Sequence, residues 1–534
     1  MPGHRVNITV DGIPVTVVAG SNLLGALKEA GVEVPHFCYH HALSISGNCR
    51  LCKVKVEGVH KLVIACTATA KEGMKISTHR TSQEVADEQK ATLEFLLINH
   101  PLDCTICDRA GQCKLQDYYL KYGGAVSNSS VSGSVVSRFE EKKETSVKAE
   151  VLGNEVIYDG ERCVTCTRCI RFCSEITRTS ELGMFNRGDR SVVGIFPGRP
   201  LENPFSGTVC DLCPVGALTH RRWRFKARIW TAAGRIKMVC PGCSTGCMVE
   251  VAVKDNEVVQ VIASENSDQM MLCDEGRYGF SRFQPTERLV LPMAHGAFNY
   301  EVCAESKLAD RFAKLKATQN DDSGKENAMF ISPFLTKDEI LAAIDFADKV
   351  LKLFVSDDNL VINPFVRQIS DLEKILVSPD YAPNIKIAGI CGMVPQELSG
   401  DAAAGFLEKR YKNLLKKVRT KKISKLVVVG DYAVRSGDID QALVSGALAC
   451  DMSIQIGTRT VQPETAQQVV SANGEVALGT RAFCEVLLPS KTVLEKSGVF
   501  INGGGLERDL NPLFAAPFGC LGESEWLGKI MVAV

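Results

Sequence analysis

The chain has 534 residues, and its 62 basic and 62 acidic side chains give a formal net charge of zero. At about 150 residues per domain, this length predicts roughly three or four domains. The balanced charge argues against a nucleic-acid binder, since such proteins usually carry a basic stripe. No run of about 18 apolar residues is free of charge, which argues against a transmembrane helix. The N-terminus has neither the apolar core of a signal peptide nor the Arg-rich prelude of a transit peptide.

The first residues predict a β-hairpin followed by a helix. Two alternating apolar segments, Val6–Val10 and Val15–Val18, are joined by an Asp-Gly turn. A helix is expected over Asn22–Ala30, with Ser21 as its N-cap and Gly31 at its end. Residues 81–125 are expected to be mostly helical, and the Ser/Val/Gly-rich segment Ser127–Ser137 is expected to be a linker or exposed loop.

From about residue 291 the pattern changes to short apolar runs separated by helical segments. This alternation predicts an α/β domain with a mainly parallel sheet. The segment Gln441–Gly457 is expected to be a helix followed by a strand. The other apolar runs are Ala328–Ile331, Lys352–Val355, Ile385–Ile390, Leu426–Val429 and Val486–Leu488.

The cysteines are distributed unevenly. Seventeen of the 22 lie between Cys38 and Cys273. A secreted disulfide scaffold would be a short chain with cysteines throughout, whereas this long chain has tight C-x-x-C clusters. Metal binding in a reducing compartment is therefore the better interpretation. Zinc and iron–sulfur sites both use thiolates, so the spacing has to distinguish them.

Four groups of residues have the composition of metal sites. The first site consists of Cys38, Cys49, Cys52 and Cys66, and the order hairpin, helix and cysteine loop favours a [2Fe–2S] cluster. The second site consists of His100, Cys104, Cys107 and Cys113, which fit either a [4Fe–4S] cluster with one imidazole ligand or a zinc ion. Gly47 and its small neighbours favour a loop whose backbone amides can approach the sulfurs of the first site.

The third site begins with the bacterial ferredoxin run C-x2-C-x2-C-x3-C, which starts at Cys163 and ends at Cys173. A second motif around Cys210 and Cys213 is incomplete, because too few thiols remain for a second cluster. One [4Fe–4S] cluster is expected, with Cys173 and Cys210 left as buried free thiols. The ligands of the third site are Cys163, Cys166, Cys169 and Cys213.

The fourth site has the spacing C-x2-C-x3-C followed by a distant cysteine, and four thiolates again suit [4Fe–4S]. Its ligands are Cys240, Cys243, Cys247 and Cys273. Zinc is the alternative at the first, second and fourth sites. Four clusters in series would make a conducting path, so the predicted chemistry is one-electron transfer, with no catalytic side chains.

The four spacings in this order, with His100 in its place, resemble the large iron–sulfur subunit of NADH-quinone oxidoreductase (respiratory complex I), known as the G subunit. Two segments are particularly similar, Cys166-Thr-Arg-Cys169-Ile-Arg-Phe and Cys213-Pro-Val-Gly-Ala-Leu-Thr. The resemblance covers about residues 5–290. The segment from Cys484 to Asn502 resembles an edge motif of molybdopterin oxidoreductases, so the tail is expected to be a shortened relative of them. The departures from the pattern are Cys173 and Cys210, and the fourth site, absent in some members, is complete here.

The resemblance implies an α+β and α/β multidomain chain with five parts. Residues 1–80 would form a β-grasp [2Fe–2S] ferredoxin domain, and residues 81–125 a helical [4Fe–4S] segment with one histidine and three cysteine ligands. Residues 126–230 would form a ferredoxin-like [4Fe–4S] domain, and residues 231–290 a [4Fe–4S] domain of the molybdopterin-oxidoreductase type. Residues 291–534 would form a degenerate molybdopterin-oxidoreductase-like α/β domain without molybdopterin.

The resemblance also implies a path from NADH to quinone, coupled in the whole complex to proton translocation. FMN and NADH would lie on a partner subunit, and quinone-side iron–sulfur subunits would receive the electrons. The fourth site would lie off this path. The chain would be peripheral, on the cytoplasmic side of a bacterial inner membrane or the matrix side in a mitochondrion. It has no G-x-G-x-x-G motif, and Gly503-Gly504-Gly505 is expected to be a loop.

Two alternatives stand beside this interpretation. A diaphorase-side subunit of an NAD-linked hydrogenase or formate dehydrogenase shares the first three cluster motifs. The hydrogenase type usually stops near residue 240, and a formate dehydrogenase would keep a longer molybdopterin domain. The other alternative is a non-redox scaffold held together by zinc.

Overall fold

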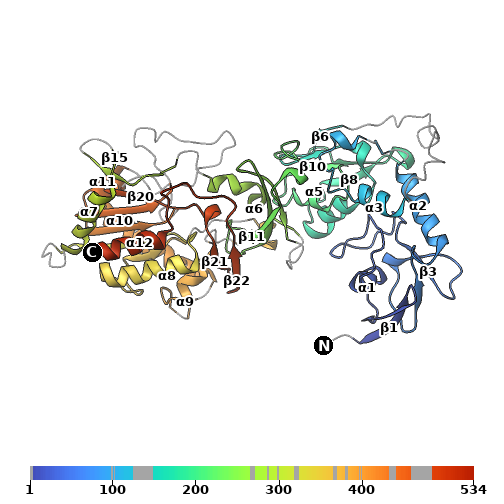
Figure 1. Ribbon diagram of the computed structural model, residues 1–534, viewed down its shortest axis with the longest axis horizontal. Coiled ribbons are helices and arrows are strands. Elements are labelled where there is room, and N and C mark those ends of the chain that lie inside the picture. Colours follow the sequence, from blue (N-terminus) through green and yellow to red (C-terminus); the bar gives the residue numbers. More distant parts are fainter. Residues whose placement is uncertain are drawn as a thin grey trace. The chain divides into compact units, whose positions relative to one another are not determined.

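The computed structural model describes residues 4–97, 100–101, 103–123, 148–264, 271–284, 288–296, 300–317, 324–364, 370–378, 383–395, 397–398, 400–431, 441–458 and 484–534. The chain divides into two compact units, Met1–Gly234 and Arg235–Val534 (Figure 1). The predicted linker Ser127–Ser137 lies outside the described residues. No described helix is long and apolar enough to cross a membrane.

The N-terminal part of the first unit is a five-stranded mixed sheet of order β2-β1-β5-β3-β4 with helix α1 (Leu23–Glu29) packed against it. The predicted hairpin is confirmed, since β1 and β2 pair antiparallel, whereas β1 and β5 are parallel. The strands are β1 (Arg5–Val10), β2 (Ile13–Val18), β3 (Lys53–Val56), β4 (Val63–Ile64) and β5 (Lys75–Ser77).

The predicted cap of α1 is wrong by one residue. Asn22, not Ser21, is the N-cap, and its side chain accepts hydrogen bonds from the backbone N–H groups of Leu24 and Gly25. The Ser21 hydroxyl instead donates to the carbonyl of Val18 at 2.7 Å. Two adjacent residues were both able to cap, and the helix begins after the second one.

The rest of the first unit is made of short elements that surround the cysteines. The expected helical character of residues 81–125 is confirmed by α2 (Gln83–Leu97) and α3 (Lys114–Tyr122). A three-stranded sheet of order β10-β7-β6 and the hairpin β8–β9 follow. These strands and the two short helices are β6 (Glu150–Val151), β7 (Val156–Tyr158), α4 (Arg168–Arg171), β8 (Leu182–Phe185), β9 (Val192–Ile195), α5 (Thr208–Leu212) and β10 (Leu218–His220).

The second unit begins with a small antiparallel sheet and continues into a large one. The small sheet consists of β11 (Arg235–Val239), β12 (Met248–Lys254) and β13 (Glu257–Ala263), and the helix α6 (Asp274–Tyr278) follows it. The large sheet has seven strands in the order β15-β14-β20-β19-β18-β16-β17, and its last five strands are parallel. This confirms the predicted mainly parallel sheet. The strands are β14 (Met293–His295), β15 (Tyr300–Val302), β16 (Glu326–Ile331), β17 (Leu360–Ile362), β18 (Ile423–Val429), β19 (Met452–Gly457) and β20 (Val486–Pro489).

Helices cover both faces of the large sheet (Figure 1). In β16, Met329 and Ile331 face the side covered by α7 (Glu305–Ala317), α8 (Lys337–Phe346) and α12 (Glu523–Ala533). Ala328 and Phe330 face the other side, which is covered by α10 (Gly400–Arg419) and α11 (Gln441–Leu448). Because both faces are buried, the runs Ala328–Ile331 and Leu426–Val429 are continuously apolar, whereas β19 contains the buried polar residues Ser453 and Gln455.

Two predicted strands are wrong. Residues 352–355 follow a helical segment that ends at Leu351, with Lys352 as its C-cap at a left-handed φ of +56°, and the strand lies later, at β17. Residues 386–390 form the short helix α9 (Lys386–Ile390). A short apolar run does not distinguish a buried strand from a buried helix turn, and both predictions rested on such runs. The loop predicted at residues 503–505 is confirmed, since it joins β21 (Gly498–Ile501) to β22 (Glu507–Leu510).

Candidate metal centres

The structure brings the four cysteines of the first site together. Cys38 lies in the loop after α1, Cys49 and Cys52 precede β3, and Cys66 lies in a 3-10 turn. The Cys38 sulfur contacts those of Cys49 and Cys66, and the Cys52 sulfur contacts that of Cys66. All but Cys49 are fully buried. A four-sulfur site is therefore held by loops and one turn beside the small sheet.

Backbone amides approach the sulfurs of the first site, as the small residues predicted. The N–H groups of Asn48 and Cys49 point to the Cys38 sulfur. Gly47 makes this turn possible, because its φ of +62° is left-handed and a Cβ there would lie 3.3 Å from Thr67 Cγ2. Asn22 supports the site from the start of α1, since its Nδ2 donates to the Cys66 carbonyl at 2.5 Å. Amide dipoles of this kind stabilise negative sulfur.

At the second site, the three cysteines interact with one another. The Cys107 thiol interacts electrostatically with those of Cys104 and Cys113. Cys113 is the N-cap residue of α3, and the N–H groups of Leu115 and Gln116 point at its sulfur. Burial nevertheless raises the pKa of the Cys113 thiol to about 11. A thiolate here therefore needs compensating positive charge.

His100 is a buried imidazole whose Nδ1 has no hydrogen-bond partner among the described residues. Burial lowers its pKa to about 4, so the ring is neutral near pH 7. The neutral imidazole is the form that binds metals. The part of His100 as the fourth ligand stays a prediction.

The second and third sites are in direct contact through Gly216. A Cβ on this residue would lie 2.3 Å from the Cys107 sulfur and 3.2 Å from Arg109 Cβ. Gly216 lies three residues after Cys213, so the loop that ends the third site forms a wall of the second. Arg162 adds an ion pair with Asp103 at 2.6 Å across the same boundary. The sequence motif contained Gly216, but its spacing alone gave no sign of this contact.

The third site is a hollow of about 340 Å³ that is lined by all four of its predicted cysteines. The cysteine loop is strained, because Thr165 and Thr167 have φ values of +49° and +57°. The Thr165 N–H lies 3.4 Å from the Cys163 sulfur. Burial raises the pKa of the Cys166 thiol to about 12. A strained loop that aims buried thiols at a common space fits a site made for a cluster.

The two remaining cysteines of this region lie outside that lining. Cys173 and Cys210 are fully buried. Cys173 faces Glu181, and burial raises the pKa of its thiol above the range in which thiolates form. Their assignment as free thiols stays a prediction.

The fourth site is also a hollow lined by its four predicted cysteines, with a volume of about 300 Å³. Cys240 and Cys247 lie at the facing ends of β11 and β12, where the Cys240 N–H donates to the Cys247 carbonyl at 2.7 Å. Cys273 is the N-cap residue of α6 and accepts from the Gly276 N–H at 3.2 Å. A Cβ on Gly276 would lie 3.2 Å from two of the sulfurs. Glycine is therefore needed beside this hollow.

The end of the edge-motif segment, at Asn502 and Gly503, contacts the loop of the fourth site. The sequence did not reveal this contact. Asn502 Nδ2 donates to the Thr245 carbonyl at 3.2 Å, and the Gly503 N–H donates to the Ser244 carbonyl at 2.6 Å. Gly246, with φ of +62°, would place a Cβ 2.8 Å from Asn502 Cβ. These contacts join residues more than 250 positions apart.

The donor sets fit iron–sulfur clusters. Fifteen cysteines and one histidine fall into four groups, and most of the sulfurs are buried. Bare thiolates in such surroundings are costly, and bound iron would supply the compensating charge.

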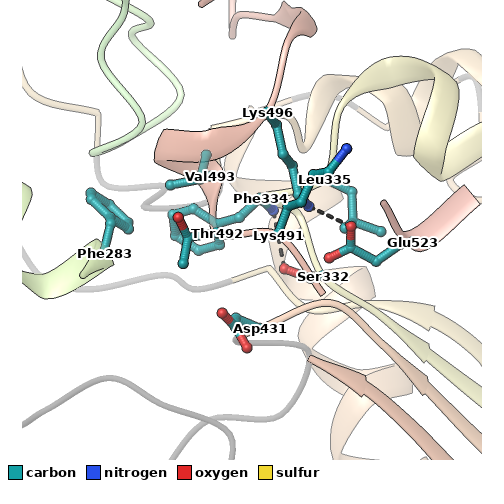
Figure 2. Close-up of a pocket in the computed structure, with 10 residues that line it drawn as sticks. All are labelled: Phe283, Ser332, Phe334, Leu335, Asp431, Lys491, Thr492, Val493, Lys496 and Glu523. Carbon is teal, nitrogen blue, oxygen red and sulfur yellow. Dashed lines mark hydrogen bonds and ion pairs between the residues drawn. The ribbon is translucent and has the colours of Figure 1, made fainter. Parts of the chain in front are cut away.

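A separate pocket of about 330 Å³ lies at the carboxyl ends of the parallel strands (Figure 2). Lys496 lines it and forms ion pairs with Glu523 at 2.7 Å and Glu339 at 3.3 Å, and all three side chains are buried. Burial, which lowers the pKa of Lys496, is outweighed by these carboxylates, so its pKa is raised. Burial raises the pKa of Glu523 far above its ordinary value. Lys496 and Glu523 line the pocket, and both belong to this buried triad.

Comparison with known families covers each of the four sites. A 2Fe-2S iron-sulfur cluster binding domain matches residues 3–81, and an NADH-ubiquinone oxidoreductase-G iron-sulfur binding region matches residues 89–126. The ferredoxin-like domain of NADH-quinone oxidoreductase subunit 3 matches residues 153–219, and the molybdopterin oxidoreductase Fe4S4 domain matches residues 235–284. The chain is similar to the G subunit of NADH-quinone oxidoreductase.

Individual relatives align over part of their length. The chain is 36% identical over 298 residues to the NADH-quinone oxidoreductase G subunit of Streptomyces coelicolor, which is 55% of this chain and 34% of that protein. It is 39% identical to the mitochondrial NADH dehydrogenase [ubiquinone] iron-sulfur protein 1 of Solanum tuberosum, over 55% of this chain and 38% of that protein. For the G subunit of Rickettsia conorii the identity is 31%, over 72% and 54%. The chain thus spans between about a third and a half of these relatives' length.

Proposed function

We propose that this chain is an electron-transfer subunit of an NADH-quinone oxidoreductase and carries electrons from an NADH-oxidising partner towards quinone. The observation that carries the proposal is the set of four cysteine-rich sites in the order of the family. Iron–sulfur clusters, when bound, accept and release single electrons. The chain itself contributes no catalytic side chain in this proposal.

Each site is assigned its cluster by its donors. The first site, in a β-grasp ferredoxin domain, holds a [2Fe–2S] cluster, and the other three sites hold one [4Fe–4S] cluster each. The second site uses the His100 imidazole in place of a fourth thiolate. The fourth site lies in a domain of the molybdopterin-oxidoreductase type, and the shortened α/β domain behind it holds no molybdopterin.

The chain's residues have three tasks in this function. The cysteines and His100 bind iron, and the buried surroundings exclude water from the sulfurs. Amide groups, such as those of Asn48 and Cys49, stabilise the added negative charge. The walls shared by neighbouring sites in the first unit, such as the one at Gly216, keep the gaps for electron transfer short.

The partners follow from the same proposal. An FMN- and NADH-binding subunit supplies electrons, and quinone-side iron–sulfur subunits remove them. The chain is a peripheral subunit that docks on these partners at the inner face of the membrane.

The test is an iron and EPR analysis of the full chain, expressed anaerobically with iron and sulfide. One binuclear and three tetranuclear centres predict about 14 iron atoms per chain. Low-temperature EPR during a redox titration is expected to resolve one binuclear and three tetranuclear signals. A folded, colourless protein that contains zinc in place of iron would refute the proposal and support the scaffold alternative.

A further inference from the structure

Two buried arginines lie between the first and third sites. Arg168 and Arg171 form the ends of α4, and they alternate in the sequence with the cysteine ligands of the third site. Their exposed fractions are only 5% and 9%. Burying a guanidinium is costly unless opposite charge or hydrogen bonds compensate it.

Arg171 joins the cysteine loops of the two sites. Its Nη2 donates to the Cys38 carbonyl at 2.6 Å and to the Cys166 carbonyl at 3.2 Å. Its Nη1 donates to the Ser44 carbonyl, and its Nε to the Thr167 hydroxyl at 3.3 Å. One guanidinium therefore bonds to the backbone of a ligand residue from each site.

Arg168 makes the same kind of bridge beside it. Its Nη2 donates to the carbonyl of Tyr39, the residue after Cys38. Its Nη1 donates to the carbonyl of Leu212, the residue before Cys213, at 3.3 Å. The Nε is buried and has no hydrogen-bond partner in the described part of the chain.

A third link between the two sites comes from the other side. Asn48, which precedes Cys49 in the first site, donates from its Nδ2 to the Thr165 carbonyl at 3.0 Å. Thr165 lies between two ligands of the third site, Cys163 and Cys166. Side chains from both cysteine loops therefore hold the two sites against each other.

Carboxylates do not neutralise these cations directly. Among the residues that the structure describes, neither arginine forms an ion pair with Asp or Glu. Glu175, which interacts electrostatically with Arg171, is bound instead by the Ser44 N–H at 2.8 Å. The groups that act electrostatically on Arg168 are the thiols of Cys166, Cys213 and Cys38, together with the Tyr118 hydroxyl. The cations are thus placed to be balanced by thiolate-ligated iron in both sites.

We propose that Arg168 and Arg171 are positioning residues that hold the first and third sites together and raise the reduction potential of both. The inference rests on the proposed function. A fixed positive charge in a buried environment favours the reduced state, because reduction adds one negative charge to the site. Carbonyl contacts on both sides hold the two cysteine loops against each other.

The test uses the full chain with its iron restored, and compares Arg168→Gln and Arg171→Gln with the wild type. Each variant should lower the reduction equilibrium constant of the first and third sites by about tenfold, which corresponds to about 59 mV for one electron. The fourth site, in the other unit, should not change. The matched control is Arg222→Gln, since Arg222 pairs with Glu155 at 2.6 Å at a part-exposed position.

The lysine variants separate charge from geometry. Arg168→Lys and Arg171→Lys keep the charge but cannot bind two carbonyls in a fork. The potentials should stay near the wild-type values, while the magnetic interaction between the two reduced sites changes. If a Gln variant loses its iron, the Lys variant at that position is used as the test in its place. A fall in the reduction potentials of the Lys variant would overturn the proposal.

Two further outcomes are decisive. A shift at one of the two sites only, or at neither, in the Gln variants overturns the shared role of the arginines while leaving the electron-transfer function intact. Wild-type protein without iron centres would instead refute the proposed function itself.

Discussion

Gly216→Ala tests whether the second and third sites share a wall. The added Cβ would lie 2.3 Å from the Cys107 sulfur, whereas ordinary contacts begin at 3.4 Å. The sulfur or the loop must therefore move by about 1 Å. Metal–ligand distances tolerate roughly 0.2 Å, so Cys107 cannot keep its place as a ligand unless the loop shifts. Overpacking of this kind costs about 1–3 kcal/mol.

The assay is low-temperature EPR of the reduced variant, with iron quantified. We expect the signal of the second site to be lost or broadened and the iron content to fall, while the first and fourth sites keep their signals. Gly25→Ala is the matched control, because its Cβ would meet nothing closer than the Tyr39 hydroxyl oxygen at 3.8 Å. An unchanged signal from the second site in Gly216→Ala would refute the close approach of the two loops.

Three other predictions follow from single contacts. His100→Cys should keep the cluster of the second site but lower its reduction potential, because a thiolate adds negative charge. An EPR redox titration measures this potential. An unaltered potential would contradict the assignment of His100 as a ligand. Asn22→Ala should destabilise α1 by about 1 kcal/mol and weaken the first site, whereas Ser21→Ala should do neither. Denaturant unfolding measures the stability of the two variants. Equal losses of stability would contradict Asn22 as the N-cap. Glu523 has a raised pKa, so folding takes up a proton there and the free energy of unfolding falls as the pH rises above about 4.5. Glu523→Gln should reduce this pH dependence of stability, measured by thermal unfolding between about pH 5 and 8. The same pH dependence in the variant and the wild type would contradict the raised pKa of Glu523.

The sequence predicted the elements that local pattern determines. The predictions of the hairpin β1–β2 and of the strands β16, β18 and β20 were correct. In each case the apolar run is bounded by a turn or a helix. The strands predicted at residues 352–355 and 386–390 were wrong, because a run of four to six apolar residues fits a helix turn as well as a strand.

The candidate sites divide in the same way. The cysteines that spacing assigned to the first, third and fourth sites lie together in the structure, and their role as ligands stays a prediction. It could not reveal the contacts between sites. Arg171 meets Cys38 across 133 positions, and Gly216 meets Cys107 across more than 100. Such long-range contacts depend on tertiary packing, which no single motif encodes.

The shared walls in the first unit have a consequence for assembly. Filling the third site would order loops that also shape the first and second sites, so we expect metal loading at the third site to favour loading at these two neighbours. Removing one ligand would also abolish the EPR signals of adjacent sites. The loss of a signal would therefore not by itself show which site the substituted residue belongs to.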